Sequence, residues 1–147
     1  MTDKQLAALT SSIYLSRLTL AGESVDTDDK RLRASGLYPD WTPGKYKTGD
    51  IYNADGQTWE CFQAYDSAVY PDIKPGDSAW YTFHRPLHGT SPETARPFVP
   101  VQGAHDIYRA GEYMIFDGTL YRCKQNTNFS PADYPSAWET LAETRKE

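Results

Sequence analysis

The sequence contains an internal repeat, in which a segment from the middle of the chain recurs with a constant offset of 62 residues. An internal period of this kind sets the architecture of a chain. Both copies close on Ser-Ala-Trp, but at an offset of 58 residues, which indicates a four-residue deletion in the preceding loop. The pairs in register are Tyr46 and Tyr108, Gly49 and Gly111, Asp50 and Glu112, Asp55 and Asp117, Gly56 and Gly118, Trp59 and Tyr121, Cys61 and Cys123, and Gln63 and Gln125. The repeat predicts two small sister modules.

We therefore expect a mainly β fold, in which a short N-terminal α-helical segment precedes two tandem small antiparallel β modules of three strands each. The helical segment covers residues 1–36, module one covers 37–82 and module two covers 100–141. A Pro-rich segment without periodicity, 83–99, is expected to be a linker, and 142–147 a charged tail. Modules this small bury little apolar surface and gain from pairing or docking.

A tight hairpin is expected in each module. The dipeptides Asp55-Gly56 and Asp117-Gly118 supply the positive φ angles that a two-residue connection needs. Aromatic and β-prone residues flank both turns, as in Thr58–Phe62 after the first and Leu120–Cys123 after the second. Trp59, together with the other aromatic residues at repeated strand and closing positions, is expected to lie in the core.

The N-terminal segment is expected to form a helix from residue 3 to about residue 21. Leu6, Leu9, Ile13 and Leu20 follow a helical spacing and form an apolar stripe. Other leucines lie off that stripe, so the helix is apolar on more than one side. Two interpretations remain open: the helix packs on the modules or a second short helix, or it docks on another protein or on its own copies.

The ends of the helices carry recognisable signals. Thr2 is expected to cap the first helix together with Gln5, and Gly22 to end it. A second short helix is expected to start after Asp26 or Thr27 and to end near Gly36. Acidic residues in its first turn and basic residues in its last turn suit the helix dipole.

The two cysteines, Cys61 and Cys123, occupy the same position in the two repeats. Sister positions face each module's own core, so a disulfide between them would require both cores to open. A free cysteine behaves as a small buried hydrophobe. We therefore expect two reduced, buried thiols, which matches folding in a reducing cytoplasm.

Charge and hydropathy limit the partners that we expect. The net charge is −5 and the chain has no basic run, so nucleic acid is not an expected partner. The longest apolar stretches are far shorter than a membrane span, so no membrane insertion is expected. The first residues lack the layout of a secretion signal, so we expect synthesis in a cytoplasm.

The motifs of the repeat resemble a known family. Tyr-x-x-Gly-Asp, an Asx-Gly turn, a strand aromatic, a Pro loop and a final Trp are similar to carbohydrate-binding module families 5 and 12, which are chitin-binding-like. A closer likeness is to bacteriophage tail and prophage proteins that carry such modules. There, a short acidic helix runs into a segment like Leu37-Tyr38-Pro39-Asp40-Trp41, and a strand like Tyr121-Arg122-Cys123 follows. Asn128-Phe129-Ser130-Pro131 also resembles a segment of those proteins.

The resemblance implies a glycan ligand, but the chain departs from the family where two adjacent aromatic residues stack on sugar rings. Gln63-Ala64 and Gln125-Asn126 stand at those places. Trp41 matches the family's first stacking position. A replacement platform would use aromatic residues in the loops, whose faces stack on the C–H faces of sugars. The candidate glycan-binding residues are Trp41, Tyr65, Tyr70, Phe129 and Tyr134.

Catalytic and metal chemistry is not expected. His84, His88 and His105 lack a neighbouring carboxylate or thiol cluster with ligand spacing, so we expect no metal and no cofactor. Asp50 and Glu112 stand one per module beside a turn glycine, where capping the turn is the expected role rather than glycoside hydrolysis. Nucleophile and phosphate-loop motifs are missing from the sequence, so we do not expect an enzyme.

The resemblance therefore implies a phage virion protein, of the tail, fibre or another surface, whose tandem modules bind a host-surface polysaccharide and serve host adsorption. The alternative is a virion structural or decoration protein, in which the modules make protein–protein contacts and bind no sugar. In both cases we expect the N-terminal helix to contact other virion proteins or further copies of the chain, for which a trimer is one option. The expected location is the virion.

Overall fold

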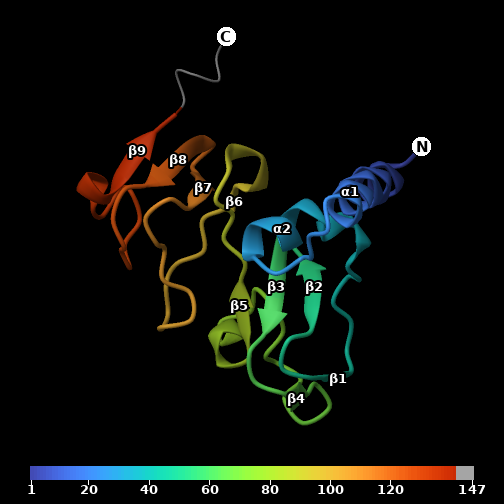
Figure 1. Cartoon of the computed structure of the whole chain (residues 1–147). Coiled ribbons are helices and arrows are strands. Elements are labelled where there is room, and N and C mark those ends of the chain that lie inside the picture. The colour runs from blue at the N-terminus through green and yellow to red at the C-terminus, as the bar shows by residue number, and fades with distance from the viewer. Residues whose placement is uncertain (142–147) are drawn as a thin grey trace. The chain divides into compact units, whose positions relative to one another are not determined.

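A computed structural model describes residues 1–141, which divide into one compact unit up to Leu87 and a second from His88 onward (Figure 1). The first unit holds the helical N-terminus and two small sheets, and the second holds a further sheet. A main N-terminal helix followed by antiparallel strands agrees with the expected mainly β fold. The expected tail, 142–147, lies outside the described residues.

The helix α1 spans Asp3–Leu20 and has the predicted N-terminal cap. Thr2 Oγ1 accepts a hydrogen bond from the Gln5 backbone N–H at 3.0 Å, and Gln5 Oε1 accepts one from the Thr2 N–H at 2.9 Å. Two N–H groups at the helix start are satisfied in this way. Gly22 follows the helix at φ 73°, where a residue with a side chain would be strained.

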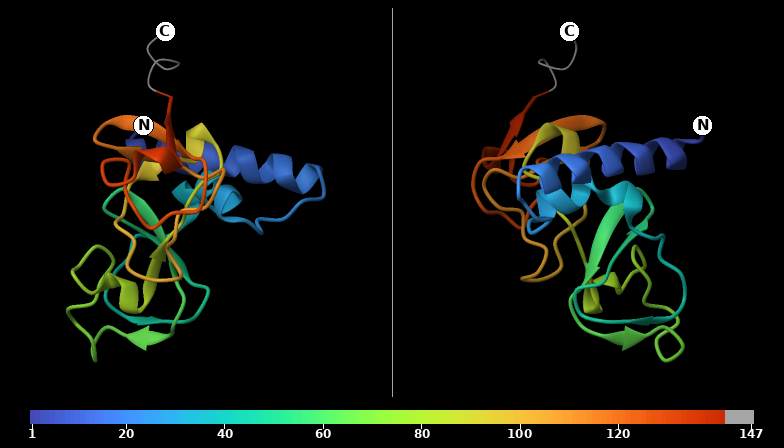
Figure 2. Two further views of the ribbon diagram at one scale, coloured as in Figure 1. Left: turned by 90° about the vertical axis from the view of Figure 1, so that its left-hand side faces the viewer. Right: turned by 45° about the vertical axis from the view of Figure 1, so that its right-hand side comes forward.

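A second, short helix and a 3₁₀ turn follow α1 and form its packing surface (Figure 2). The helix α2 spans Asp28–Arg33, with Thr27 as its cap, and η1 spans Ser35–Leu37. Ser11 of α1 donates a hydrogen bond to the Arg33 carbonyl at 3.2 Å, and its hydroxyl accepts one from the Gly36 N–H at 3.0 Å. One face of α1 therefore packs against the unit's own helical turns, as one of the two interpretations proposed.

The main sheet of the first unit has three antiparallel strands in the order β2-β3-β5. Two shorter strands, β1 and β4, pair with each other, and Figure 1 shows them at the end of the main sheet remote from α2. A 3₁₀ turn, η2, precedes β5. The bounds are β1 Lys45–Tyr46, β2 Ile51–Ala54, β3 Gln57–Cys61, β4 Tyr65–Asp66, η2 Trp80–Thr82 and β5 His84–Pro86.

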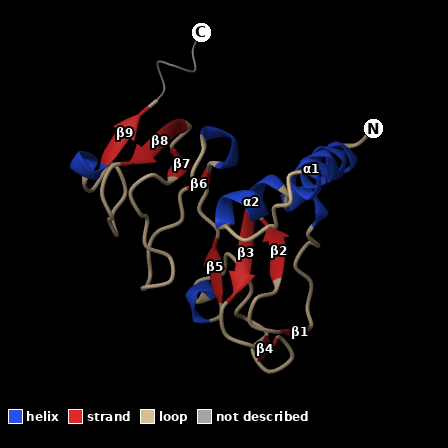
Figure 3. Ribbon diagram, in the orientation of Figure 1, coloured by secondary structure: helices blue, strands red, loops and turns tan. Residues whose placement is uncertain are grey.

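The second unit is built on a four-stranded sheet in the order β6-β7-β8-β9. The edge strand β6 runs parallel to β7, and the other neighbours are antiparallel. Figure 3 colours the strands of both units red. Two 3₁₀ turns, η3 and η4, lie in its loops. The bounds are η3 Pro92–Thr94, β6 Arg96–Pro97, β7 Tyr113–Phe116, β8 Thr119–Cys123, η4 Pro135–Ala137 and β9 Trp138–Thr140.

The two hairpins keep the register of the sequence repeat. Tyr52 pairs with Trp59 across β2 and β3, and Met114 pairs with Tyr121 across β7 and β8, each partner 62 residues later. The turns fall at the predicted dipeptides, where Asp55 and Asp117 both have φ 53°. Such angles are costly for residues other than glycine and are tolerated best by Asp and Asn. Both hairpin turns are confirmed.

The turns that precede the hairpins are also repeated. The Asp50 carboxylate accepts a hydrogen bond from the Lys47 N–H at 2.8 Å, and the Glu112 carboxylate accepts one from the Arg109 N–H at 2.8 Å. The capping role predicted for both acidic residues is confirmed. Gly49 and Gly111 immediately precede these acids, and their backbone N–H groups donate hydrogen bonds to the carbonyls of Cys61 and Cys123.

Cys61 and Cys123 are free and fully buried, as predicted. Each thiol donates a hydrogen bond to the carbonyl two residues on, at 3.1 Å for Cys61 and 2.9 Å for Cys123. Burial raises the pKa of both thiols, and that of Cys123 reaches about 11. The repeated cysteines are structural members of two separate cores.

The structure corrects the expected linker 83–99. His84–Pro86 forms β5 of the first sheet, and Arg96–Pro97 forms β6 of the second. The third strand of the first sheet therefore lies in this segment, which also supplies an additional parallel edge strand to the second sheet. A proline in each strand hides it from pattern recognition, although proline is tolerated at sheet edges.

The two closing Ser-Ala-Trp segments occupy different places in the two units. The interpretation of their offset as a four-residue deletion between equivalent segments is therefore wrong. Cys61 pairs with His84, whereas Cys123 pairs with Trp138, so His84 occupies the place of Trp138. Trp80 instead belongs to η2. Both tryptophans nevertheless pack beside the sister strand aromatic: Trp80 lies 5.3 Å from Trp59 and Trp138 lies 6.4 Å from Tyr121, between ring centroids.

An ion pair crosses the last two strands of each sheet, with its charges exchanged between the units. Glu60 on β3 pairs with Arg85 on β5, and their atoms Oε1 and Nη2 are 2.6 Å apart. In the second unit Arg122 on β8 pairs with Glu139 on β9 at 3.1 Å. The acid and the base have thus changed strands while the register of the pair is kept.

Buried aromatic and aliphatic side chains fill each unit. In the first, Tyr52, Trp59 and Leu87 are among the buried residues, and Leu32 of α2 is buried as well. The core of the second unit consists of Tyr108, Met114, Cys123, Ala137 and Trp138. None of the helices within residues 1–141 combines the length and the apolar character that crossing a membrane requires.

Candidate functional site

Trp41 lies in a row of nearly parallel aromatic rings in the first unit. Its ring is 5.9 Å from that of Tyr46, and Tyr46 is 5.7 Å from Tyr65, with angles of 12° and 15° between the ring planes. The Trp41 Nε1 donates a hydrogen bond to the Tyr65 hydroxyl at 3.0 Å. Trp41 is half-buried, and its backbone N–H bonds to the Asn53 carbonyl on β2.

Tyr65 belongs to the core of the first unit. The Tyr65 ring stacks both on Tyr46 and on Phe83, and the centroids of the Tyr65 and Phe83 rings are 4.4 Å apart. Only 7% of Tyr65 is exposed. Burial raises its pKa to about 12. A ring covered in this way has no free face for a sugar, which corrects its assignment as a ligand residue; Tyr65 instead positions Trp41.

Tyr70 lies on an exposed loop of the same unit. It is 46% exposed, and its ring is 5.1 Å from Phe83, the ring that stacks on Tyr65. Trp41, Tyr65 and Tyr70 are therefore linked through one aromatic cluster, although their exposures differ. Two of the three predicted residues in this unit, Trp41 and Tyr70, retain ring surface that a ligand could contact.

The second unit has a counterpart of Trp41 that the sequence repeat conceals. The Phe98 N–H bonds to the Ile115 carbonyl on β7, just as the Trp41 N–H bonds to Asn53 on β2. The Phe98 ring also stacks on Tyr108, at 5.2 Å and 16°, as Trp41 stacks on the sister residue Tyr46. Phe98 is therefore the counterpart of Trp41 in the second unit.

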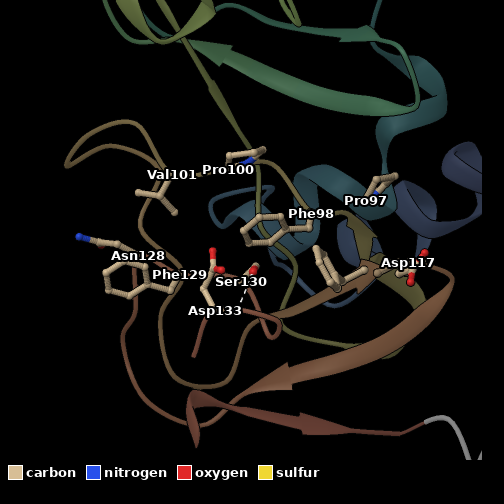
Figure 4. Close-up of a pocket in the computed structure, with 11 residues that line it drawn as sticks. Pro97, Phe98, Pro100, Val101, Asp117, Asn128, Phe129, Ser130 and Asp133 are labelled. Carbon is tan, nitrogen blue, oxygen red and sulfur yellow. Dashed lines mark hydrogen bonds between the residues drawn. The ribbon is translucent and has the colours of Figure 1, made fainter. Parts of the chain in front are cut away.

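A pocket of about 700 Å³ opens beside Phe98 (Figure 4). Figure 4 shows the Phe98 ring in its middle, with Phe129 at one end and Asp117 at the other, and with Asp133 and Ser130 between them. The volume is in the usual range for small-ligand sites. The lining comes from β6 and the segment after it, from β7 and its turn, and from the loop before β9. It comprises Pro97, Phe98, Pro100, Val101, Ile115, Phe116, Asp117, Asn128, Phe129, Ser130 and Asp133.

Backbone and ring contacts hold Phe129 at the pocket's end. Trp138 Nε1 donates a hydrogen bond to the Phe129 carbonyl at 3.0 Å, and the Phe129 N–H bonds to the Thr127 hydroxyl at 3.0 Å. The ring is 56% exposed and meets Tyr134 edge to face at 6.4 Å. The structure therefore brings Phe129 and Tyr134 together, as two residues of one unit.

A smaller pocket of about 320 Å³ adjoins the first and shares Asn128 and Phe129 with it. Arg109, Asn126 and Tyr134 contribute to its lining. The Tyr134 hydroxyl accepts a hydrogen bond from Gln125 Nε2 at 3.3 Å, so this glutamine orients an aromatic residue of the pocket. Phe129 thus lines both pockets.

Sequence reasoning found Phe129 and Tyr134 but missed Phe98, Phe116, Asn128 and Asp133. One sequence signal could have identified Phe98: it is an aromatic residue that precedes the repeated tyrosine Tyr108, as Trp41 precedes Tyr46. The spacing hides it, because Trp41 stands five residues before Tyr46 and Phe98 stands ten before Tyr108. The polar lining residues lie in loops that have no counterpart in the repeat.

The histidines have structural partners. His84 is fully buried between the Tyr52 hydroxyl and the Ile73 carbonyl, and burial lowers its pKa. His88 Nδ1 lies 2.9 Å from the Glu112 carboxylate, and its ring stacks on Tyr108. Within residues 1–141, no group of three His, Cys, Asp or Glu side chains is arranged to hold a metal ion.

Comparison of the chain with protein-family models gives no match, and comparison with curated proteins gives none either.

Proposed function

We propose that the chain is a phage virion protein, of the tail or another surface, that binds host glycan in the pocket beside Phe98. The proposal combines the carbohydrate-binding-like motifs of the repeat with one observation: aromatic rings and hydrogen-bonding side chains line the same pocket. Each unit is then a small carbohydrate-binding-like module, elaborated by an additional edge strand in the second. Adsorption to a host surface requires binding and no catalysis, so we propose that the chain binds glycan without a chemical reaction.

The chemistry of the lining suits a sugar. Phe98 and Phe129 present apolar rings to the pocket, and such rings stack on the C–H faces of pyranoses. The Asp133 carboxylate accepts hydrogen bonds, and the Asn128 amide both donates and accepts them, as sugar hydroxyls require. An apolar floor with a few polar groups that fix orientation is the common design of small-ligand sites.

The first unit offers a weaker surface of the same kind, formed by Trp41 and Tyr70. Because two sites in one chain, and many chains on one particle, bind as a linked set, overall avidity exceeds that of one site by about 10²–10⁴. A pocket that binds weakly on its own therefore suffices for adsorption of a particle. The ligand that we propose is a soluble or cell-wall-linked polysaccharide rather than crystalline chitin or cellulose.

A glycan array probed with the purified chain tests this proposal. We expect signal on a subset of bacterial polysaccharides, and we expect Phe129→Ala to reduce it by about tenfold or more, because a stacking ring is lost. Tyr81→Ala is the matched control, since Tyr81 is 44% exposed but lies in the other unit and lines no part of the pocket. Equal loss in both variants, or no binding by the native chain to any glycan, contradicts the proposal.

The second candidate is a virion structural protein, in which these modules contact other proteins. One specific observation favours it: the leucines of α1 that follow the helical spacing are exposed, so they do not pack within their own unit. Particles that carry Tyr70→Ala with Phe129→Ala separate the two candidates. Unchanged adsorption by normally assembled particles favours the structural role.

A further inference from the structure

The face of α1 that points away from its own unit carries a regular apolar stripe. Leu6, Leu9, Ile13 and Leu20 are 54%, 46%, 47% and 89% exposed. The steps of three and four residues between the first three continue through Ser16 to Leu20, which is the a/d spacing of a coiled coil. This spacing favours another helix as the partner, because knobs of this period fit the holes of a helix.

The opposite face of α1 is already occupied. Ser11 and Leu18, seven residues apart, are its buried residues, and Ser11 bonds to the turn at Arg33 and Gly36. At 100° per residue these two positions lie diametrically across the helix from the stripe. One face of α1 therefore packs on its own unit, and the opposite face is an exposed edge of the molecule. This edge is about 27 Å long, because α1 has 18 residues and rises 1.5 Å per residue.

We propose that this edge pairs with α1 of a second copy of the chain, in an antiparallel two-helix arrangement. The charges beside the stripe select this partner and this direction. When Leu9 of one copy packs against Ile13 of the other, Asp3 of each copy lies beside Arg17 of its partner, which makes two symmetric ion pairs. An isologous contact of this kind closes on itself and gives a dimer.

The remaining positions beside the stripe agree with self-association. Gln5, Ser12 and Thr19 form the other flank and carry no charge, so identical helices do not repel each other there. In a parallel pair, Gln5 would face Thr10 and Ser12 would face Arg17, and neither contact joins opposite charges. Charge complementarity at such flanks commonly sets helix orientation.

Sedimentation of the full chain over a concentration series tests the pairing. We expect a reversible monomer–dimer equilibrium, and we expect Leu9→Gln with Ile13→Gln to abolish the dimer. Both side chains are exposed in the single chain, so circular dichroism should show an unchanged fold. Val69→Gln is the matched control, because it replaces a 65% exposed apolar side chain outside α1 and should leave the dimer intact.

A charge exchange tests the direction. Arg17→Asp places two acids beside each other in each symmetric contact, so we expect the dissociation constant to rise by roughly tenfold at low salt. Adding Asp3→Arg restores opposite charges only if the helices are antiparallel, and should recover most of the affinity. Within one helix these residues are about 21 Å apart, so the exchange does not act within a single chain.

Three outcomes overturn the proposal: a monomer at every concentration, a trimer, or a dimer that the double glutamine variant leaves intact. A charge-exchanged variant as weak as Arg17→Asp overturns the antiparallel direction. The dimer is independent of glycan binding, and the pocket variant Phe129→Ala should dimerise as the native chain does.

Discussion

Arg85 on β5 donates two hydrogen bonds, of 2.8 and 2.9 Å, to the carboxylate of Asp28 in the first turn of α2. The same guanidinium bonds to Glu60 on β3 at 2.7 Å. The side chains of Arg85 and Asp28 are 21% and 24% exposed, so both charges are largely removed from water. A single arginine therefore fastens the helical segment to the sheet, across 57 residues of sequence.

Replacing Arg85 with alanine should destabilise the first unit by about 2–3 kcal/mol, because two partly buried carboxylates lose their partner. Arg122→Ala is the matched control. Its pair with Glu139 crosses the equivalent strands, but the two side chains are 41% and 48% exposed, so the expected loss is under about 1 kcal/mol. Urea unfolding followed by tryptophan fluorescence measures both, and equal losses would contradict the interpretation.

Acid should weaken the same connection. Burial alone raises the pKa of Asp28, but the hydrogen bonds and charges of Arg85 and Arg31 outweigh burial, so the pKa lies below its usual 3.8. A carboxylate whose pKa falls on folding stabilises the folded state fully above its unfolded pKa and loses that contribution as pH falls through the folded pKa. We expect the stability difference between the native chain and Asp28→Asn to be constant from about pH 5 to 7 and to shrink below about pH 4. A difference that does not vary with pH would exclude this role.

The docking of α1 depends on a glycine. A Cβ atom at Gly36 would lie 2.3 Å from the Ala7 carbonyl oxygen, which is backbone and cannot turn aside. We expect Gly36→Ala to cost about 1–3 kcal/mol and to increase amide hydrogen exchange in α1. Gly44→Ala is the control, since nothing lies within 4 Å of a Cβ there, and it should change stability by less than about 0.5 kcal/mol.

The two thiols should be unreactive in the folded protein. Cys61 and Cys123 are fully buried, and burial raises the pKa of both, so little thiolate is present near neutral pH. A disulfide-exchange reagent should modify neither residue until denaturant is added, and then both. Prompt modification of one thiol under native conditions would show that its unit opens readily.

The repeat predicted the parts of the fold that local chemistry determines. The Asp-Gly turns, the capping acids and the buried cysteines recur because each position satisfies a backbone or packing requirement that its neighbours in sequence create. The cap at Thr2 and the end of α1 follow from the same kind of local signal. These elements were placed within one or two residues of their observed bounds.

The pairing of distant segments could not be predicted. β5 and β6 contain Pro86 and Pro97 and have no alternation, so only their partners in the sheets define them. The likeness of Ser78-Ala79-Trp80 to the second closing segment suggested a false equivalence, because the loop before β5 adds a turn that sequence similarity does not mark. The burial of Tyr65 depends on Phe83, whose position follows from that turn.

The exchange of charges between Glu60–Arg85 and Arg122–Glu139 bears on how such a chain avoids misfolding. Sister hairpins in one polypeptide can accept each other's third strand, a characteristic failure of repeat proteins. Such a swap would set Arg85 against Arg122, and Glu60 against Glu139. Like charges directly opposite each other destabilise a strand pair. We therefore expect each hairpin to pair with its own closing strand in preference to that of its sister.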